Sequence, residues 1–129
     1  MKFLKALFAV LLMSCAVCWA QAVGVSAKPL LRTALSGDET KETLILAIEF
    51  APGATTGRHV HPGDEYAVVL EGLLELRVEG QAFRRVTSGQ AYHNARGVIH
   101  ETVNVGEGPA RSVATFVVDK GKPVTVPAP

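Results

Sequence analysis

The residues of this chain best suited to chemistry are three histidines and one glutamate. His59 and His61 stand two positions apart, Glu65 follows the bend-prone segment 62–64, and His100 lies later in the chain. On a β-strand, side chains at i and i+2 leave the same face, so both imidazoles can converge on one ion. A bend at 62–64 can return the Glu65 carboxylate to that point, and His100 can complete the set from a later strand.

The donor set itself indicates the kind of ion. Three neutral imidazoles and one carboxylate favour a divalent transition metal over calcium or magnesium, which prefer oxygen ligands. A His-x-His pair alone is also typical of two exposed histidines on an edge strand. The residues therefore predict a metal site, with a metal-free cluster of hydrogen-bonded histidines as the alternative.

Short strands are expected to position these side chains. In the run 43–50, four apolar side chains, Leu44, Leu46, Ile48 and Phe50, alternate with their neighbours, as in a half-buried strand. Further apolar runs at 66–70, 73–78, 82–86 and 112–118 are separated by turn residues, which predicts meander hairpins. No stretch shows three turns of helical period. The pattern predicts an all-β small barrel or double-sheet jelly roll, with an end at 127–129 that frays.

The spacing of the four residues resembles the two motifs of the cupin superfamily. The first motif is matched at all five fixed positions, which are Gly53, His59, His61, Glu65 and Gly72. The second is matched at four of five positions, Gly89, Gly97, His100 and Asn104, with Ala95 where the family usually has proline. Alanine there removes a fixed φ angle from the loop before His100 but deletes no ligand.

The resemblance covers residues 53–104 and implies a single-domain cupin β-barrel. It implies that His59, His61, Glu65 and His100 bind one divalent transition-metal ion per chain inside the barrel. It leaves the identity of that ion open among zinc, copper, manganese, iron and nickel.

Length and charge restrict the partners of the protein. With 129 residues the chain is expected to form one domain. Thirteen Lys and Arg residues against twelve Asp and Glu residues leave no basic stripe, so nucleic-acid binding by counterion release is not expected. The expected partner is a small-molecule ligand.

The first twenty residues are predicted to be a Sec-type signal peptide. Early lysines precede the mostly apolar run Ala6–Ala20, and small residues favour cleavage after Ala20 or Ala22. That run is shorter than the roughly 20 residues that span a bilayer, so a stable membrane span is not expected. A membrane anchor and lipoprotein processing at Cys15 are the alternatives. The cupin domain then occupies 21–129, in a secreted or periplasmic protein.

Further predictions concern other parts of the chain. The apolar segment Val23–Leu35 is expected to lie along the sheet of a partner chain, which predicts a homodimer. Among further polar residues, His93 is expected in an exposed loop and Asp64 in a turn. Tyr66 and Tyr92 are expected either at the rim of a pocket or in the core.

Two classes of function remain. Four protein ligands leave about two adjacent positions of an octahedral shell, which suit substrate and dioxygen, as in the small quercetin-dioxygenase-like cupins that this chain resembles. Glu65 is then the candidate general base. The alternatives are a non-catalytic metal-binding or ligand-binding sensor module and a sugar isomerase-like cupin. Small inward positions at Ala67, Val69 and Thr102 predict a neutral or weakly acidic ligand that binds the metal through oxygen atoms.

Overall fold

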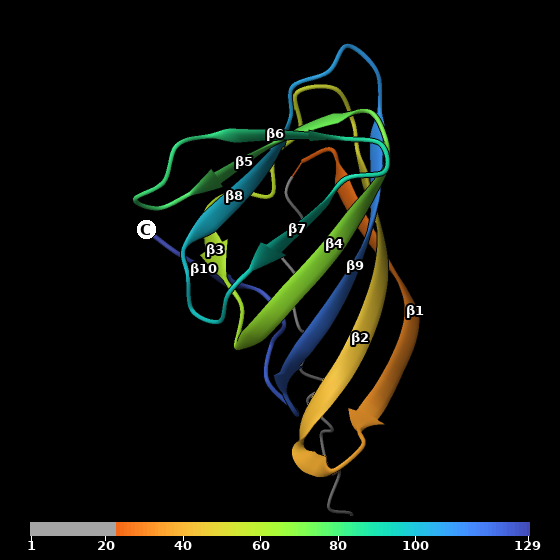
Figure 1. The fold of residues 1–129 in the computed structure, drawn as a ribbon, viewed down its shortest axis with the longest axis vertical. Helices are drawn as coiled ribbons and strands as arrows, with labels where there is room; N and C mark the ends of the chain where they lie inside the picture. Colours follow the sequence, from red (N-terminus) through yellow and green to blue (C-terminus); the bar gives the residue numbers. More distant parts are fainter. Residues whose placement is uncertain (1–22) are drawn as a thin grey trace, which may run out of the picture.

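The computed structural model describes residues 23–129, which form two five-stranded antiparallel sheets packed face to face (Figure 1). The first sheet contains, in spatial order, β1 (Val25–Leu35), β2 (Asp38–Phe50), β9 (Ala110–Asp119), β4 (Gly63–Glu71) and β7 (Ala91–Asn94). The second contains β10 (Val126–Pro127), β3 (His59–Val60), β8 (His100–Asn104), β5 (Leu73–Val78) and β6 (Arg84–Thr87). No helix occurs within 23–129. The predicted all-β jelly roll is confirmed.

The predicted signal peptide, with its cleavage after Ala20 or Ala22, lies outside the described residues, as does the alternative lipidation at Cys15. Over residues 23–129 no helix is long and apolar enough to cross a membrane.

The core lies between the two sheets and is built by the alternation of buried and exposed positions. On β2 the four side chains predicted to share a face are all buried: Leu44, Leu46, Ile48 and Phe50. Phe116 and Val118 of β9 extend this face, and Leu74 of β5 packs from the opposite sheet. Each large apolar side chain removed from water contributes about 1.5–3 kcal/mol, so the alternation both closes the sandwich and sets which side chains face its interior.

The chain changes sheet at Gly72, which corrects the hairpin predicted between 66–70 and 73–78. β4 pairs with β9 and β7, whereas β5 pairs with β8 and β6 in the other sheet. Gly72 has a φ of 84°, and a Cβ atom there would lie 2.7 Å from the Ala110 Cα atom. The crossing needs a residue without a side chain. The hairpin of β5 and β6 is confirmed.

The segment Val23–Leu35 does not need a partner chain to be paired. β1 runs antiparallel to β2 of its own chain, from Val25 opposite Phe50 to Leu35 opposite Asp38. It is an edge strand, which suits Pro29 because proline has no N–H to donate to a further strand. The homodimer remains a prediction, but this segment no longer argues for it.

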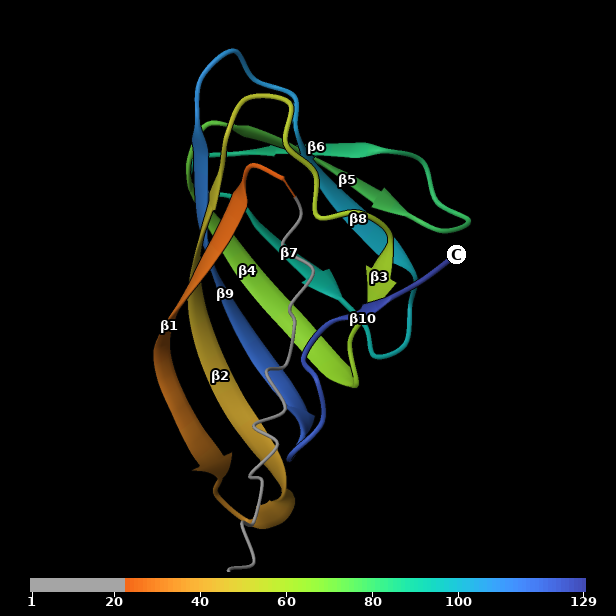
Figure 2. The same ribbon diagram turned by 180° about the vertical axis from the view of Figure 1, so that it is seen from behind.

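The C-terminal end is ordered by backbone pairing, so the prediction that it frays is wrong. Val126 and Pro127 of β10 pair with Val60 and His59 of β3, and Figure 2 shows β10 running beside β3 on its way to the C-terminus. The Ala128 N–H donates to the Arg58 carbonyl oxygen at 3.0 Å. The tail thereby gives the two-residue strand β3 its second neighbour.

The pairing of β4 with β9 is expected to require a glycine at position 63. A Cβ atom on Gly63 would lie 2.0 Å from the Val117 carbonyl oxygen and 2.6 Å from the Val118 Cα atom. Gly63→Ala should therefore lower the free energy of unfolding by about 1–3 kcal/mol, measured by urea denaturation. Gly108→Ala is the control, since nothing lies within 4 Å of its Cβ position, and should change stability by less than about 0.5 kcal/mol. Equal losses in both variants would contradict this account.

Candidate metal centre

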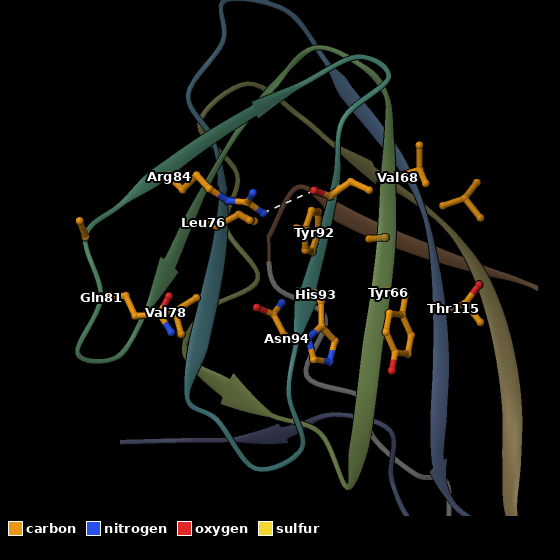
Figure 3. A pocket seen from close by; sticks show the side chains of 14 residues that line it. Tyr66, Val68, Leu76, Val78, Gln81, Arg84, Tyr92, His93, Asn94 and Thr115 are labelled. Carbon is orange, nitrogen blue, oxygen red and sulfur yellow. Dashed lines mark hydrogen bonds between the residues drawn. The ribbon is translucent and has the colours of Figure 1, made fainter.

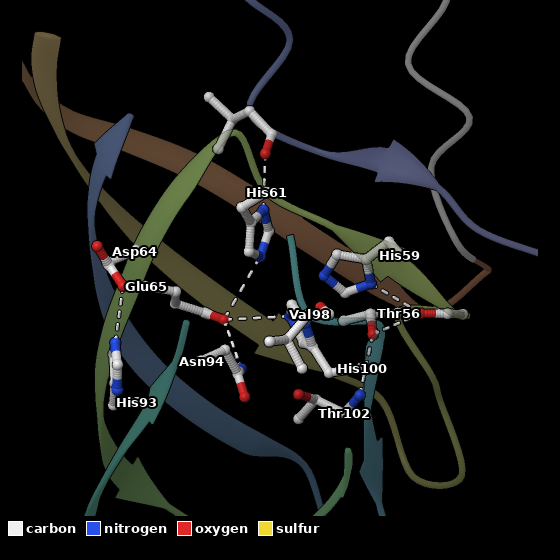
Figure 4. A network of polar contacts seen from close by, with 12 residues as sticks. Thr56, His59, His61, Asp64, Glu65, His93, Asn94, Val98, His100 and Thr102 are labelled. Carbon is white, nitrogen blue, oxygen red and sulfur yellow. Dashed lines mark hydrogen bonds and ion pairs between the residues drawn. The ribbon is translucent and has the colours of Figure 1, made fainter. Parts of the chain in front are cut away.

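The fold brings the three histidines and the glutamate together between the sheets. His59 and His100 begin strands β3 and β8 and stand opposite each other in that ladder, and His61 follows β3 directly. Glu65 comes from β4 in the other sheet. All four side chains are buried, and Figure 4 shows them converging on one point. One ring nitrogen of each histidine lies within 4.8 Å of the other two.

Backbone carbonyls determine the tautomer of each histidine. The Nδ1 atoms of His59, His61 and His100 lie 2.8, 2.6 and 2.9 Å from carbonyl oxygens of Gly57, Val124 and Val98, respectively. Because a carbonyl oxygen can only accept a hydrogen bond, each Nδ1 must carry the proton. In the neutral ring the Nε2 atom then presents a lone pair, which is the form of imidazole that binds metals.

The Glu65 carboxylate faces two of these lone pairs. Its Oε2 atom lies 3.4 Å from Nε2 of His61 and 3.4 Å from Nε2 of His100. Both Nε2 atoms are buried without a hydrogen-bond partner among the described residues. Two acceptors that face each other at this distance repel unless a cation or proton lies between them. The buried donor set therefore fits a divalent transition-metal ion.

Burial also sets the charge of these groups. Desolvation lowers the pKa of His59 from 6.5 to about 4, and the neighbouring imidazoles His100 and His61 add to the effect. Burial raises the pKa of Glu65, but His100, His61 and Asn94 lower it by more, so the pKa ends below its usual range. Near neutral pH the site holds a neutral His59 and an ionised Glu65, as metal coordination requires.

Three of the four residues, His59, His61 and Glu65, line a small apolar cavity of about 150 Å³. Its apolar wall consists of Leu46, Ile48, Phe50, Tyr92 and Phe116, with side chains of β1 at one end. Thr56 and Thr102 contribute hydroxyl groups, and neither Lys nor Arg lines it. The two other small residues predicted to face inward, Ala67 and Val69, are buried but do not line this cavity.

Of the four weaker candidates, three lie together at the surface and one lies in the core. His93 is exposed as expected but lies on β7 rather than in a loop, and its Nε2 atom is 2.9 Å from the Asp64 Oδ1 atom. Asp64 itself is on β4, not in a turn, and the His93 ring stacks on exposed Tyr66 with centroids 4.8 Å apart. Tyr92 is a core residue whose pKa is raised by burial, so its hydroxyl stays protonated.

The sequence interpretation missed two contributors to the site. Asn94, 2% exposed, donates from Nδ2 to the Glu65 Oε2 atom at 2.8 Å, and Val124 supplies the carbonyl that holds His61. Asn94 stands opposite Glu65 in the β4–β7 ladder. Asn94 stands two positions after Tyr92, so the sequence could have predicted that both side chains point inward. It could not predict that Asn94 stands opposite Glu65 on β4.

The depressed pKa of His59 should make the stability of the metal-free protein depend on pH. Between pH 6.5 and about 4 the unfolded chain binds a proton at His59 and the folded chain does not. The free energy of unfolding should therefore fall as pH decreases through this window, by on the order of 3 kcal/mol, and His59 should contribute no further loss below it.

Urea unfolding at several pH values measures this slope. His59→Gln should flatten it, whereas His93→Gln, which changes an exposed histidine, should not. An unchanged slope in His59→Gln would show that the pH dependence has another source.

Comparison with known proteins gives three informative relatives. The Beta-alanine degradation protein BauB of Pseudomonas aeruginosa is 41% identical over 69 residues, which are 51% of this chain and 72% of that protein. Germin-like protein 1-1 of Oryza sativa subsp. japonica is 35% identical over 85 residues, 62% of this chain and 39% of that protein. The HTH-type transcriptional regulator PuuR of Escherichia coli is 31% identical over 80 residues, 61% of this chain and 43% of that protein. This chain thus spans about two fifths of the length of the germin-like protein and of the regulator.

Solved structures share the architecture. An oxalate oxidase in complex with glycolate superimposes with a TM-score of 0.63 at 25% identity, over 81% of this chain and 55% of that one. A protein with a double-stranded beta-helix domain from Klebsiella pneumoniae has a TM-score of 0.67 at 18% identity, over 83% of this chain and 86% of that one. The latter likeness shows the fold alone.

The profile of the Cupin domain family matches residues 46–118, more than half of the chain. The matched segment contains both predicted motifs and all four residues of the candidate metal centre. The chain therefore belongs to the cupin family.

Proposed function

We propose that this cupin binds one divalent transition-metal ion per chain through His59, His61, Glu65 and His100 and acts as an oxygenase-like enzyme. The observation that carries the metal assignment is the set of three Nδ1 atoms held by carbonyls, which leaves two Nε2 lone pairs, those of His61 and His100, facing an ionised carboxylate. A bound ion would supply Lewis acidity and, if redox-active, a route for electrons to dioxygen.

The residues of the chain have separate tasks in this proposal. Backbone carbonyls hold the imidazoles in one orientation, and Asn94 holds the Glu65 carboxylate by its 2.8 Å hydrogen bond. Glu65 would help to hold the ion, and its ionised carboxylate could accept the proton of a substrate hydroxyl as general base. Phe50 and Phe116 exclude water from the space beside the site.

The cavity lining supports a small neutral or weakly acidic substrate that chelates through two oxygen atoms. With no Lys or Arg in its lining, a sugar phosphate would leave charge unpaired in an apolar space, which disfavours sugar isomerase-like chemistry. Its volume of about 150 Å³ lies below the roughly 300 Å³ at which pockets for drug-sized ligands begin, so a catechol or β-diketone fits better than a flavonol. The oxalate oxidase neighbour binds glycolate, also a small oxygen chelator.

A sensor module is the second candidate. The observation that favours it is the similarity to PuuR, a transcriptional regulator, over 61% of this chain. In that case the metal and its ligand would be bound without turnover, because the same barrel serves many functions.

We also propose that the chain is exported through its predicted Sec signal. When the protein folds outside the cytoplasm, the affinity of the site for each metal decides which ion it acquires. The Irving–Williams order of these affinities then favours copper or zinc over manganese or iron.

A homodimer remains part of the proposal, on a different basis from the N-terminal segment. Tyr66, Val68 and Leu70 project from the outer face of β4 with exposed fractions of 50, 43 and 55%, and a second copy would cover them. Light scattering at micromolar concentration should give twice the chain mass. A monomer mass over this range would contradict the dimer.

Metal content tests the ligand assignment. Elemental analysis of protein purified from the periplasm should find about one transition-metal ion per chain. His61→Ala should abolish metal binding, because the three remaining ligands bind the ion too weakly to compete with the buffer. His93→Ala is the matched control, since His93 lies outside the cluster, and should keep the ion. Full occupancy after the double change His59→Ala and His61→Ala would contradict the assignment.

Oxygen uptake separates the two candidate functions. Metal-loaded protein should consume dioxygen with a catechol or a β-diketone and not with a sugar phosphate. Glu65→Gln should lower turnover by about 10²–10⁴-fold, the usual contribution of a general base, and more than it lowers metal content. Tight binding of these compounds without oxygen uptake would support the sensor instead.

A further inference from the structure

A second, larger cavity lies where the free edges of the two sheets meet. β7 is the last strand of its sheet and β6 the last strand of the other. A crevice of about 860 Å³ lies between them and extends over the outer face of β4 and β9, where Val68 and Thr115 line it (Figure 3). We call it the seam crevice, and its main lining side chains are Val68, Leu76, Val78, Arg84, Tyr92 and Asn94.

The seam crevice is distinct from the cavity of about 150 Å³ beside His59, His61 and Glu65, which we call the metal cavity. Of the residues that line the two spaces, only Tyr92 lines both. Tyr92 and Asn94 are the inward side chains of β7, so this strand forms the partition between them. A ligand in the seam crevice would therefore approach Glu65 from the side opposite the metal cavity, with Asn94 in between.

Asn94 presents an unused hydrogen-bond acceptor at this partition. The side chain is 2% exposed, and its Nδ2 atom is engaged by the Glu65 carboxylate. Its Oδ1 atom is buried and has no hydrogen-bond partner within residues 23–129. Figure 3 shows the carboxamide reaching from β7 into the gap toward Leu76 and Val78. Buried amide oxygens nearly always have a donor, so a donor from the seam crevice would complete this one.

The free edge of β7 adds backbone groups to the same space. The Val69 N–H donates to the Gln90 carbonyl at 2.9 Å, so Gln90 turns its backbone groups toward β4. Backbone groups alternate in direction along a strand, so those of Ala91 and His93 turn toward the seam crevice. Consistent with this, the Arg84 Nη2 atom lies 3.5 Å from the Ala91 carbonyl. The His93 N–H and carbonyl face the same side.

We propose that the seam crevice is a binding site for a small, uncharged aromatic amide. The ring would pack on Leu76 and Val78, the amide N–H would donate to Asn94 Oδ1, and the amide carbonyl would accept from the free edge of β7. A carboxylate has no donor for Oδ1 and would lie close to the charge of Glu65. An ammonium group has no acceptor for the backbone N–H groups at the free edge of β7. Its positive charge would also be repelled by the Arg84 guanidinium, which lines the crevice. The site does not depend on the proposed metal chemistry.

Three probes with the same ring test this assignment: benzamide, benzoate and benzylamine. Each is titrated into ¹⁵N-labelled, metal-free protein, so that a failure of the metal proposal does not affect the result. Benzamide should shift the Asn94 side-chain NH₂ signals and the amides of Ala91 and His93 with a Kd on the order of 1 mM, and the other probes should bind at least about tenfold more weakly.

Two tryptophan variants locate the binding. Ala82→Trp fills the seam crevice from an exposed loop and should weaken benzamide at least about tenfold, whereas Ala34→Trp on β1, outside the crevice, should leave binding unchanged. The dispersion of the same spectra shows whether both variants fold. Absence of shifts, equal binding of all three probes, or unchanged benzamide binding by Ala82→Trp would overturn the proposal. Broadening at these residues that follows protein concentration alone would assign the seam crevice to a second copy instead.

Discussion

The hydrogen bonds from three imidazole Nδ1 atoms to backbone carbonyls are the constraint on which the site depends. They fix each tautomer, aim each Nε2 lone pair inward and remove rotational freedom from three buried rings. Two of the carbonyls, from Gly57 and Val98, lie two residues before the histidine that they hold, so local chain geometry supplies them. The third comes from Val124, sixty-three residues from His61, and it depends on the packing of the C-terminal segment, in which Val124 is buried in the core and β10 pairs with β3.

The site is assembled by the closing of the sandwich as well as by local structure. Histidines come from the sheet of β3 and β8, and Glu65 comes from the sheet of β4. Packing the sheets together buries a carboxylate and three acceptors in one place, an arrangement that disfavours the metal-free fold and favours any cation that neutralises it. Metal binding and folding are then thermodynamically linked, because an ion that binds only the closed sandwich stabilises it.

The sequence predicted those features that repeat locally. The fold class, the inward face of β2 and the turn between β5 and β6 follow from alternation and turn residues within a few positions. The sheet change at Gly72 was missed, because whether consecutive strands pair depends on what lies across the sandwich, here Ala110. Asn94 and Val124 were missed for the same reason. Each acts on a residue at least twenty-nine positions away, through a register that a single sequence does not display.

Strand β7 shows how one short element can separate two chemistries. Its inward side chains, Tyr92 and Asn94, form part of the wall between the metal cavity and the seam crevice. The metal cavity is small, and no Lys or Arg lines it. The metal-ligating side chains and the shape of the cavity therefore determine which ligand it binds. The seam crevice is larger and offers backbone groups of β7 and the Asn94 amide oxygen. Hydrogen bonds to these groups therefore determine which ligand it binds. Since the cupin fold itself does not determine function, the lining of these two spaces, rather than the barrel, decides what the protein binds.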